Sequence, residues 1–285
     1  MTAMVAEVEF NAGGLRLAGK EWGRSDAQPV LALHGWLDNC ASFDVLAPLL
    51  DNVHLIALDL AGHGKSDHRR AGAPYQIWQD VGDLYDVVEQ LGWRQFSLLG
   101  HSRGAIISTL FAGTFPERVS HLALIDGIWA TPVEPEQAPQ QLRNAIEALR
   151  RDPVKASKII PDIETAIRAR QHGRLPVTEA MATLLVERGV KPVAGGYQWS
   201  TDPQLMLPSE VKFSKAHFAA FVKNITAKAH LIVANDGLQR FRQNYRDSLN
   251  QFPNIAVEEL SGGHHLHMGD NVAAVANSVN RLFRQ

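Results

Sequence analysis

Hydrophobic residues recur along this chain in two patterns that alternate with each other. Short, continuous apolar runs are typical of strands buried on both faces of a sheet, and they occupy residues 29–33, 54–59, 96–99, 121–126 and 230–234. Between these runs apolar residues recur every three or four positions, as in 81–91, which predicts helices that pack one face on the sheet. Strands and helices that alternate in this way predict an α/β fold with a parallel, doubly wound sheet.

Less regular patterns complete this prediction at both ends of the chain. Residues 5–10 and 15–22 alternate apolar and polar side chains around a turn at 11–14, which predicts an antiparallel hairpin at the sheet edge. A strand at 255–260 is expected before a last helix at 272–283. Further helices are expected over residues 42–50 and through Phe241, Tyr245 and Leu249.

The alternation stops after Gly127. The chain then shows helical patterns broken by prolines and no convincing strand, with helix candidates at 137–151, 153–172, 177–188 and 209–224. We therefore expect a core domain made of residues 1–129 and 224–285, and a helical cap of residues 130–223 inserted after the sixth strand.

Composition narrows the class of protein. The 285 residues carry a formal net charge of −2 without a basic run, which argues against a nucleic-acid partner. No apolar run approaches the roughly 20 residues of a membrane span, and residues 1–10 lack the regions of a signal peptide. The single cysteine, Cys40, excludes an internal disulfide and favours a reducing compartment. We expect a cytoplasmic monomer or homodimer that acts on a small molecule.

The motif Gly100-His101-Ser102-Arg103-Gly104 offers the first candidate chemistry. It follows an apolar run and begins a helix, and its two glycines let strand and helix approach closely around a sharp turn. Such a turn, called a nucleophile elbow, presents the Ser102 hydroxyl above the sheet edge. The N–H of Arg103 is then expected at a helix N-terminus, where backbone donors favour a developing oxyanion.

Four segments together carry a resemblance to a known family. They are His34-Gly35-Trp36, the glycine-rich loop from Asp59 to Ser66, the Gly100–Gly104 motif, and Gly262-Gly263-His264. In this order and at this spacing they resemble the α/β-hydrolase family over nearly the whole chain. The stretch Gly195-Gly196-Tyr197-Gln198-Trp199, followed by Asp202-Pro203, looks similar to the serine-hydrolase-like subgroup. The resemblance implies a mostly parallel, eight-stranded sheet flanked by helices, with an inserted helical cap.

The resemblance also assigns catalytic roles. Ser102 is the implied nucleophile, and His264 is the implied base, with His265 and His267 as neighbours that could substitute. The backbone N–H groups of Trp36 and Arg103 are the implied oxyanion hole. No cysteine or acidic ligand motif accompanies the histidine cluster, so we expect no metal, and the implied reaction needs no cofactor.

The acid that orients the imidazole has two candidates. In most of the family it follows the seventh strand, where the pattern places Gly237, with Asp236 one residue early. The other known position follows the sixth strand, where this chain has Asp126. We favour Asp126 and keep Asp236 as the alternative.

Other residues near these motifs have positioning or binding interpretations. Asp59 is expected to brace its loop through Ser66, and His63 to hold a loop. The Arg103 side chain is expected either to pair with a carboxylate or to bind an anionic group of the substrate, and we favour the carboxylate pairing. Substrate contacts are expected from Trp36, His101 and Trp199.

These assignments predict a cofactor-independent serine hydrolase that cleaves an ester-type acyl bond of a small apolar or aromatic substrate through an acyl-enzyme. Hydrolysis of a C–C bond or a thioester, and perhydrolysis, use the same groups and stay open. Dehalogenase and epoxide hydrolase reactions are disfavoured, because those relatives carry Asp at the position of Ser102. A non-catalytic, ligand-binding protein of the same fold is the alternative from another class.

Overall fold

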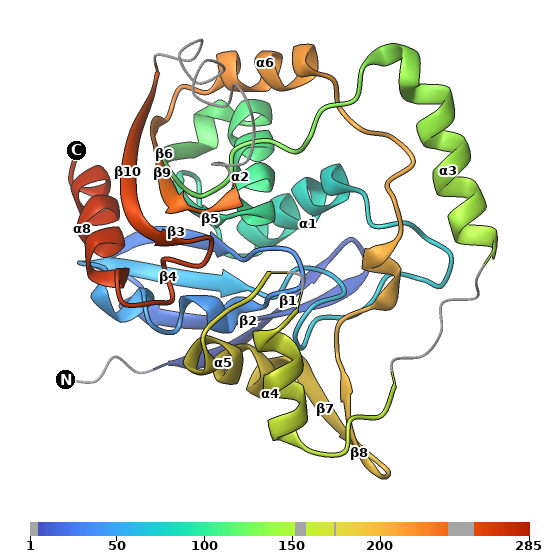
Figure 1. Ribbon diagram of the computed structural model, residues 1–285. Helices are drawn as coiled ribbons and strands as arrows, with labels where there is room; N and C mark the ends of the chain where they lie inside the picture. The colour runs from blue at the N-terminus through green and yellow to red at the C-terminus, as the bar shows by residue number, and fades with distance from the viewer. Residues whose placement is uncertain (1–4, 152–157, 174, 239–253) are drawn as a thin grey trace.

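The chain folds around one sheet of eight strands, in the order β1-β2-β4-β3-β5-β6-β9-β10 (Figure 1). The computed structural model describes residues 5–151, 158–173, 175–238 and 254–285. The strands are β1 Ala6–Ala12, β2 Leu15–Gly23, β3 Gln28–Leu33, β4 Val53–Leu58, β5 Phe96–His101, β6 Val119–Ile125, β9 Lys228–Asp236 and β10 Ile255–Gly263. From β4 to β10 all neighbours are parallel, whereas β1 and β2 form an antiparallel hairpin at one edge. The predicted sheet, including its edge hairpin, is confirmed.

Both faces of the sheet are covered, which explains why its central strands are apolar without interruption. Along β3, Leu31 and Leu33 point into one core cluster, with α1 (Ile77–Gln90), α2 (Arg103–Thr114) and α6 (Lys215–Asn224). Val30 and Ala32 point into the opposite cluster, with α8 (Val272–Phe283). Successive side chains of a strand face opposite sides, so a strand between two layers must be apolar at every position.

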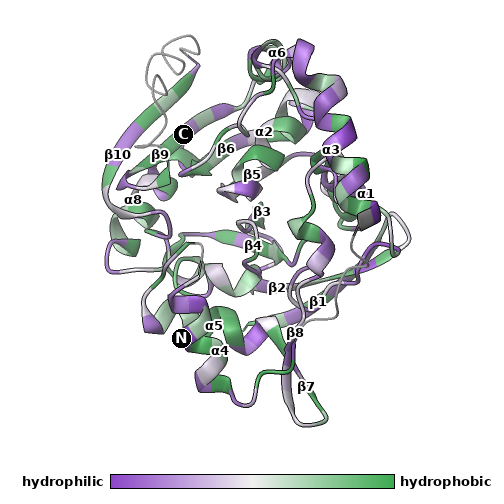
Figure 2. Cartoon of the chain, turned by 45° about the vertical axis from the view of Figure 1, so that its right-hand side comes forward, coloured by the Kyte–Doolittle hydropathy of each residue, from purple (hydrophilic) through white to green (hydrophobic). Residues whose placement is uncertain are grey.

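The segment between β6 and β9 holds most of the remaining elements. They are α3 Ala138–Arg151, α4 Ile163–Gln171, α5 Glu179–Gly189, β7 Val190–Val193, β8 Gly196–Trp199 and α6. Figures 1 and 2 show α4, α5, β7 and β8 gathered together, away from α3. No described helix has the length and apolar character needed to cross a membrane.

The antiparallel pair β7 and β8 corrects the prediction that residues 130–223 contain only helices. Gly195 and Gly196 adopt positive φ angles of 88° and 145°, which allow the tight turn between the two strands. Each strand is only four residues long, and Pro192 lies in one of them. So short a run shows no clear alternation, and proline argues against a strand away from a sheet edge.

Two other helix predictions are also corrected. Residues 42–50 form short 3₁₀ segments, Cys40–Phe43 and Ala47–Leu49, because Pro48 lacks the N–H that a continuous helix needs. The helix expected from residue 153 begins at Ile163, after Asp162 caps it by accepting from the Thr165 N–H at 2.7 Å. The helix expected through Phe241, Tyr245 and Leu249 lies outside the described residues, as do residues 152–157 of the former one.

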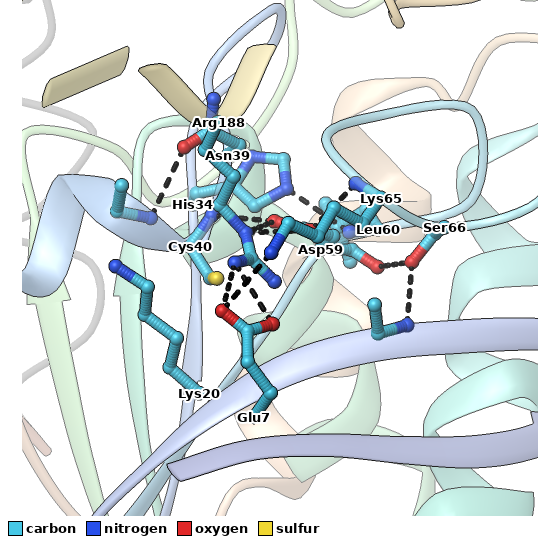
Figure 3. Close-up of polar contacts among 12 residues, drawn as sticks. Glu7, Lys20, His34, Asn39, Cys40, Asp59, Leu60, Lys65, Ser66 and Arg188 are labelled. Atoms are coloured by element: carbon cyan, nitrogen blue, oxygen red, sulfur yellow. Dashed lines mark hydrogen bonds and ion pairs between the residues drawn. The ribbon is translucent and has the colours of Figure 1, made fainter. Parts of the chain in front are cut away.

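A network of ion pairs centred on the buried Arg188 ties α5 to the core (Figure 3). The Arg188 Nε lies 2.8 Å from Asp59 Oδ2, and its Nη1 lies 2.8 Å from Glu7 Oε1. Burial alone would lower the pKa of the Arg188 guanidinium, but the hydrogen bond with Glu7 and the charge of Asp59 raise it. Asp59 also accepts from the Lys65 N–H at 2.8 Å, while the Ser66 hydroxyl donates to the Asp59 carbonyl at 2.6 Å. The expected bracing of the Asp59 loop through Ser66 is confirmed.

The network predicts that Arg188→Met is strongly destabilising. The replacement leaves the buried Asp59 carboxylate without its cationic partner, which should lower the free energy of unfolding by about 3–5 kcal/mol. Urea denaturation measures the change. Arg24→Met is the matched control, because the Arg24–Asp26 pair is exposed and should contribute nothing measurable. Equal effects of the two replacements would contradict the prediction.

Candidate active site

Ser102 occupies the sharp turn between β5 and α2, with φ 51° and ψ −111°. A positive φ is strained for a residue with a side chain, so the surrounding packing must hold it. A Cβ added to Gly104 would lie 2.0 Å from the Leu33 carbonyl oxygen, and one added to Gly100 would lie 2.5 Å from the Ala105 Cα. The two glycines therefore permit the close approach of strand and helix that their spacing predicts.

His264 lies between a hydroxyl and a carboxylate. Its Nε2 is 2.9 Å from Ser102 Oγ, and its Nδ1 is 2.6 Å from Asp126 Oδ2. An ionised carboxylate only accepts hydrogen bonds, so Nδ1 carries the ring proton and the Nε2 lone pair faces the serine hydroxyl. The structure thus brings together a serine, a histidine and an aspartate that are far apart in the sequence.

The carboxylate at His264 Nδ1 is that of Asp126, the residue after β6. Asp126 is buried and accepts from the N–H groups of Ala234 and Leu238, both at 3.1 Å. A Cβ on Gly237 would lie 2.2 Å from Asp126 Oδ2. The glycine at the usual acid position is therefore required by the carboxylate that fills the space above it. Asp236 lies at the exposed end of β9.

The loop after β3 carries the other expected oxyanion donor, the N–H of Trp36. The next residue, Leu37, has φ 64° and donates its N–H to His63 Nε2 at 3.3 Å. His63 thus holds this loop, as expected. The Arg103 N–H lies in the first turn of α2, where amides have no acceptor within the helix.

The Arg103 side chain turns away to Asp80 in α1, with Nη2 2.5 Å from Oδ2. The structural pairing expected for this guanidinium is confirmed.

His101 departs from its expected place in a substrate pocket. It is completely buried, and its Nε2–H donates to the His264 carbonyl at 2.8 Å. Burial, followed by the neighbouring His267 and His264, holds the pKa of His101 well below its usual value. Side chains alternate along β5, so the residue before Ser102 points to the layer beneath the turn rather than to its mouth.

The two candidates to substitute for His264 are also engaged elsewhere. His265 Nε2 lies 3.1 Å from Asp38 Oδ2, and His267 packs its ring on His101 at 4.1 Å. Burial lowers the pKa of His267 to about 3, so its ring is neutral near neutral pH. The sequence did not single out Asp38, because an aspartate two residues after Trp36 carries no motif of its own.

A cavity of about 330 Å³ lies between the loop after β3 and the segment that follows β6. Its wall is largely apolar and includes Trp36, Leu37, Leu175, Trp199, Pro203 and Met206. The Trp36 indole N–H donates to the Leu205 carbonyl at 3.2 Å, which fixes the ring. Two of the three residues expected at the substrate, Trp36 and Trp199, are thus in the wall of one cavity. Arg170 also lines it and was not predicted from the sequence.

Comparisons with known proteins agree with this fold. A family model described as alpha/beta hydrolase fold matches residues 28–174. Human serine hydrolase-like protein 2 is 32% identical, over 96% of this chain and 94% of its own. The crystal structure of a hypothetical protein from Pseudomonas aeruginosa superposes with a TM-score of 0.91 at 43% identity, covering 97% of both chains. A thioesterase domain from the curacin biosynthetic pathway has a TM-score of 0.84 at 25% identity, covering 97% of this chain and 99% of that one. This chain belongs to the α/β-hydrolase family, among its serine hydrolase-like proteins.

Proposed function

We propose that the protein is a cofactor-independent serine hydrolase that cleaves an ester-type acyl bond through an acyl-enzyme. The observation that carries this proposal is the continuous chain of hydrogen bonds from Ser102 Oγ through His264 to Asp126. A serine hydroxyl is a poor nucleophile at neutral pH and needs such a base beside it.

The proposed mechanism follows from the hydrogen bonds among these three side chains. Ser102 attacks the substrate carbonyl while His264 Nε2 takes its proton, and Asp126 stabilises the imidazolium that forms. The N–H groups of Trp36 and Arg103 donate to the oxyanion. The imidazolium then protonates the leaving group, and a water activated by the same base releases the acyl group from Ser102.

We propose that residues 130–223 form a cap over this site and that the apolar cavity receives the acyl group. The tryptophan rings and aliphatic side chains of its wall favour a small apolar or aromatic group. Thioester cleavage is the second candidate, supported by the similarity to the thioesterase domain. A non-catalytic ligand-binding role is disfavoured, because a binding site does not require a base aligned on a hydroxyl.

Replacing the nucleophile tests the mechanism. Ser102→Ala should lower kcat for p-nitrophenyl ester hydrolysis by about 10⁶-fold, because no hydroxyl remains to form the acyl-enzyme. Labelling by a fluorophosphonate probe should disappear with it, while the circular dichroism spectrum stays unchanged. Full activity in purified Ser102→Ala would exclude this mechanism, and an inactive, unlabelled wild type would favour the binding role.

Replacing each aspartate distinguishes the two candidate acids. Asp126→Asn should lower kcat by about 10⁴-fold, because an amide donor at Nδ1 favours the wrong imidazole tautomer. Asp236→Asn is the matched control and should retain nearly full activity. Steady-state kinetics on the same ester decide between them, and the reverse result would reassign the acid to Asp236.

The size of the cavity predicts a preference for acyl length. Each buried methylene contributes about 0.8 kcal/mol, so kcat/KM should rise up to about fourfold per methylene until the cavity is full. Leu175→Phe should shift the optimum towards shorter chains in a p-nitrophenyl ester series. Leu142→Phe, at an exposed position of α3, is the control. An unshifted optimum in Leu175→Phe would show that the acyl group binds elsewhere.

A further inference from the structure

A second polar layer lies directly behind the proposed catalytic groups, and it is built from their sequence neighbours. His101 precedes the serine, His265 follows the proposed base, and Asp38 comes two residues after Trp36. These three side chains are buried, at 0%, 4% and 2% exposure respectively. A buried polar group lowers the stability of the fold unless it forms hydrogen bonds or ion pairs. The partners of these three side chains therefore decide whether the fold tolerates them.

Asp38 is the centre of this layer. Its Oδ2 lies 3.1 Å from His265 Nε2 and 3.8 Å from His101 Nδ1. Burial alone would raise the pKa of the Asp38 carboxyl, but the charges of His265 and Arg170 hold it well below its usual value. His101 in turn donates to the His264 carbonyl, so the layer contacts the backbone of the base itself.

Another partner of Asp38 comes from the segment between β6 and β9. Arg170 in α4 places Nη2 2.7 Å from Asp38 Oδ1, and its Nη1 donates to the Leu175 carbonyl at 2.8 Å. Both Arg170 and Leu175 line the cavity. One guanidinium therefore connects the cavity wall, helix α4 and the carboxylate behind the active site.

Asp38, His101 and His265 are also residue types that bind divalent cations. Ligand atoms of Asp38, His101 and His265 all lie within 4.8 Å of one another. However, Arg170 Nη2 lies 2.7 Å from Asp38 and 3.5 Å from His265 Nε2. This fixed positive charge repels a cation at the same place and already neutralises the carboxylate. The arrangement favours positioning over metal binding.

We propose that Asp38 is a positioning residue that, with Arg170, couples the cavity to the active site. By holding the His265 ring and the loop that contains Trp36, Asp38 fixes the distance between the base and an oxyanion donor. Arg170 holds Asp38 from the cavity side. Replacing Arg170 should therefore displace the reacting groups of the active site. The inference rests on the proposed hydrolase function.

A double-mutant cycle tests the coupling. Asp38→Asn and Arg170→Gln should each lower kcat by about 10–100-fold, the range expected for misplaced reacting groups, with much smaller changes in KM. The double variant should be no worse than the more impaired single variant, because both act through one connection. Arg168→Gln is the matched control, since Arg168 lies in the same helix and donates to Thr165 of that helix.

Hydrogen exchange supplies a readout that does not depend on turnover. In Asp38→Asn, amides of residues 34–38 and 264–268 should exchange faster than in wild type, while thermal unfolding verifies that the variant is folded. Unchanged exchange in both loops overturns the proposal, as do additive losses of kcat or variants that behave like Arg168→Gln. Loss of wild-type activity on chelation with EDTA, restored by Zn²⁺, also overturns it in favour of a metal site. A wild type that neither hydrolyses esters nor labels at Ser102 refutes the hydrolase function instead, and hydrogen exchange then decides the positioning role alone.

Discussion

The hydrogen bond between His264 and Asp126 is the contact on which the rest of the site depends. It joins residues 138 positions apart, and at 2.6 Å it fixes which ring nitrogen carries the proton. That contact exists because β6, β9 and β10 are adjacent and parallel, so their carboxyl ends reach the same edge. The parallel sheet therefore determines the tautomer of His264 as well as the position of its ring.

Two arginines of the segment between β6 and β9 reach buried carboxylates of the core. Arg188 of α5 reaches Asp59 at the end of β4, and Arg170 of α4 reaches Asp38 after β3. Both carboxylates are buried, and both belong to the loops that surround the proposed oxyanion site. Removing one partner of a buried pair is costly because the other charge stays behind, so each pair fixes the segment in one place. The Asp59 pair thus contributes mainly to stability, whereas the Asp38 pair, in our proposal, also positions the groups of the active site.

The sequence predicts the sheet and the Ser102 turn well because both follow from local rules. Continuous apolar runs identify strands between two layers, and Gly100 and Gly104 identify a turn that no larger residue fits. The choice between Asp126 and Asp236 is different, because it depends on which of two adjacent strand ends faces His264. Gly237, at the usual acid position, argues against an acid there, but only the folded chain shows that Asp126 meets His264.

Other features were missed for equally physical reasons. The direction of the His101 side chain follows from where β5 ends, and a shift of one residue reverses it. Strands β7 and β8 are too short for a period to be visible. Arg170 is one of two arginines in its helix, and only the folded chain shows that it is the one that turns inward.

The space above Gly237 has a consequence for how this site can change over evolutionary time. Asp126 Oδ2 fills the volume that a side chain at position 237 would occupy, so an acid at one strand end excludes a side chain at the other. Either of the two strand ends can place a carboxylate at this position beside His264, but not both at once. Moving the acid between these strands therefore requires exchanging aspartate and glycine together, because two acids at once would be crowded and a site with neither would lack an orienting group. Gly237, just after β9, therefore indicates that the end of β6 supplies the carboxylate.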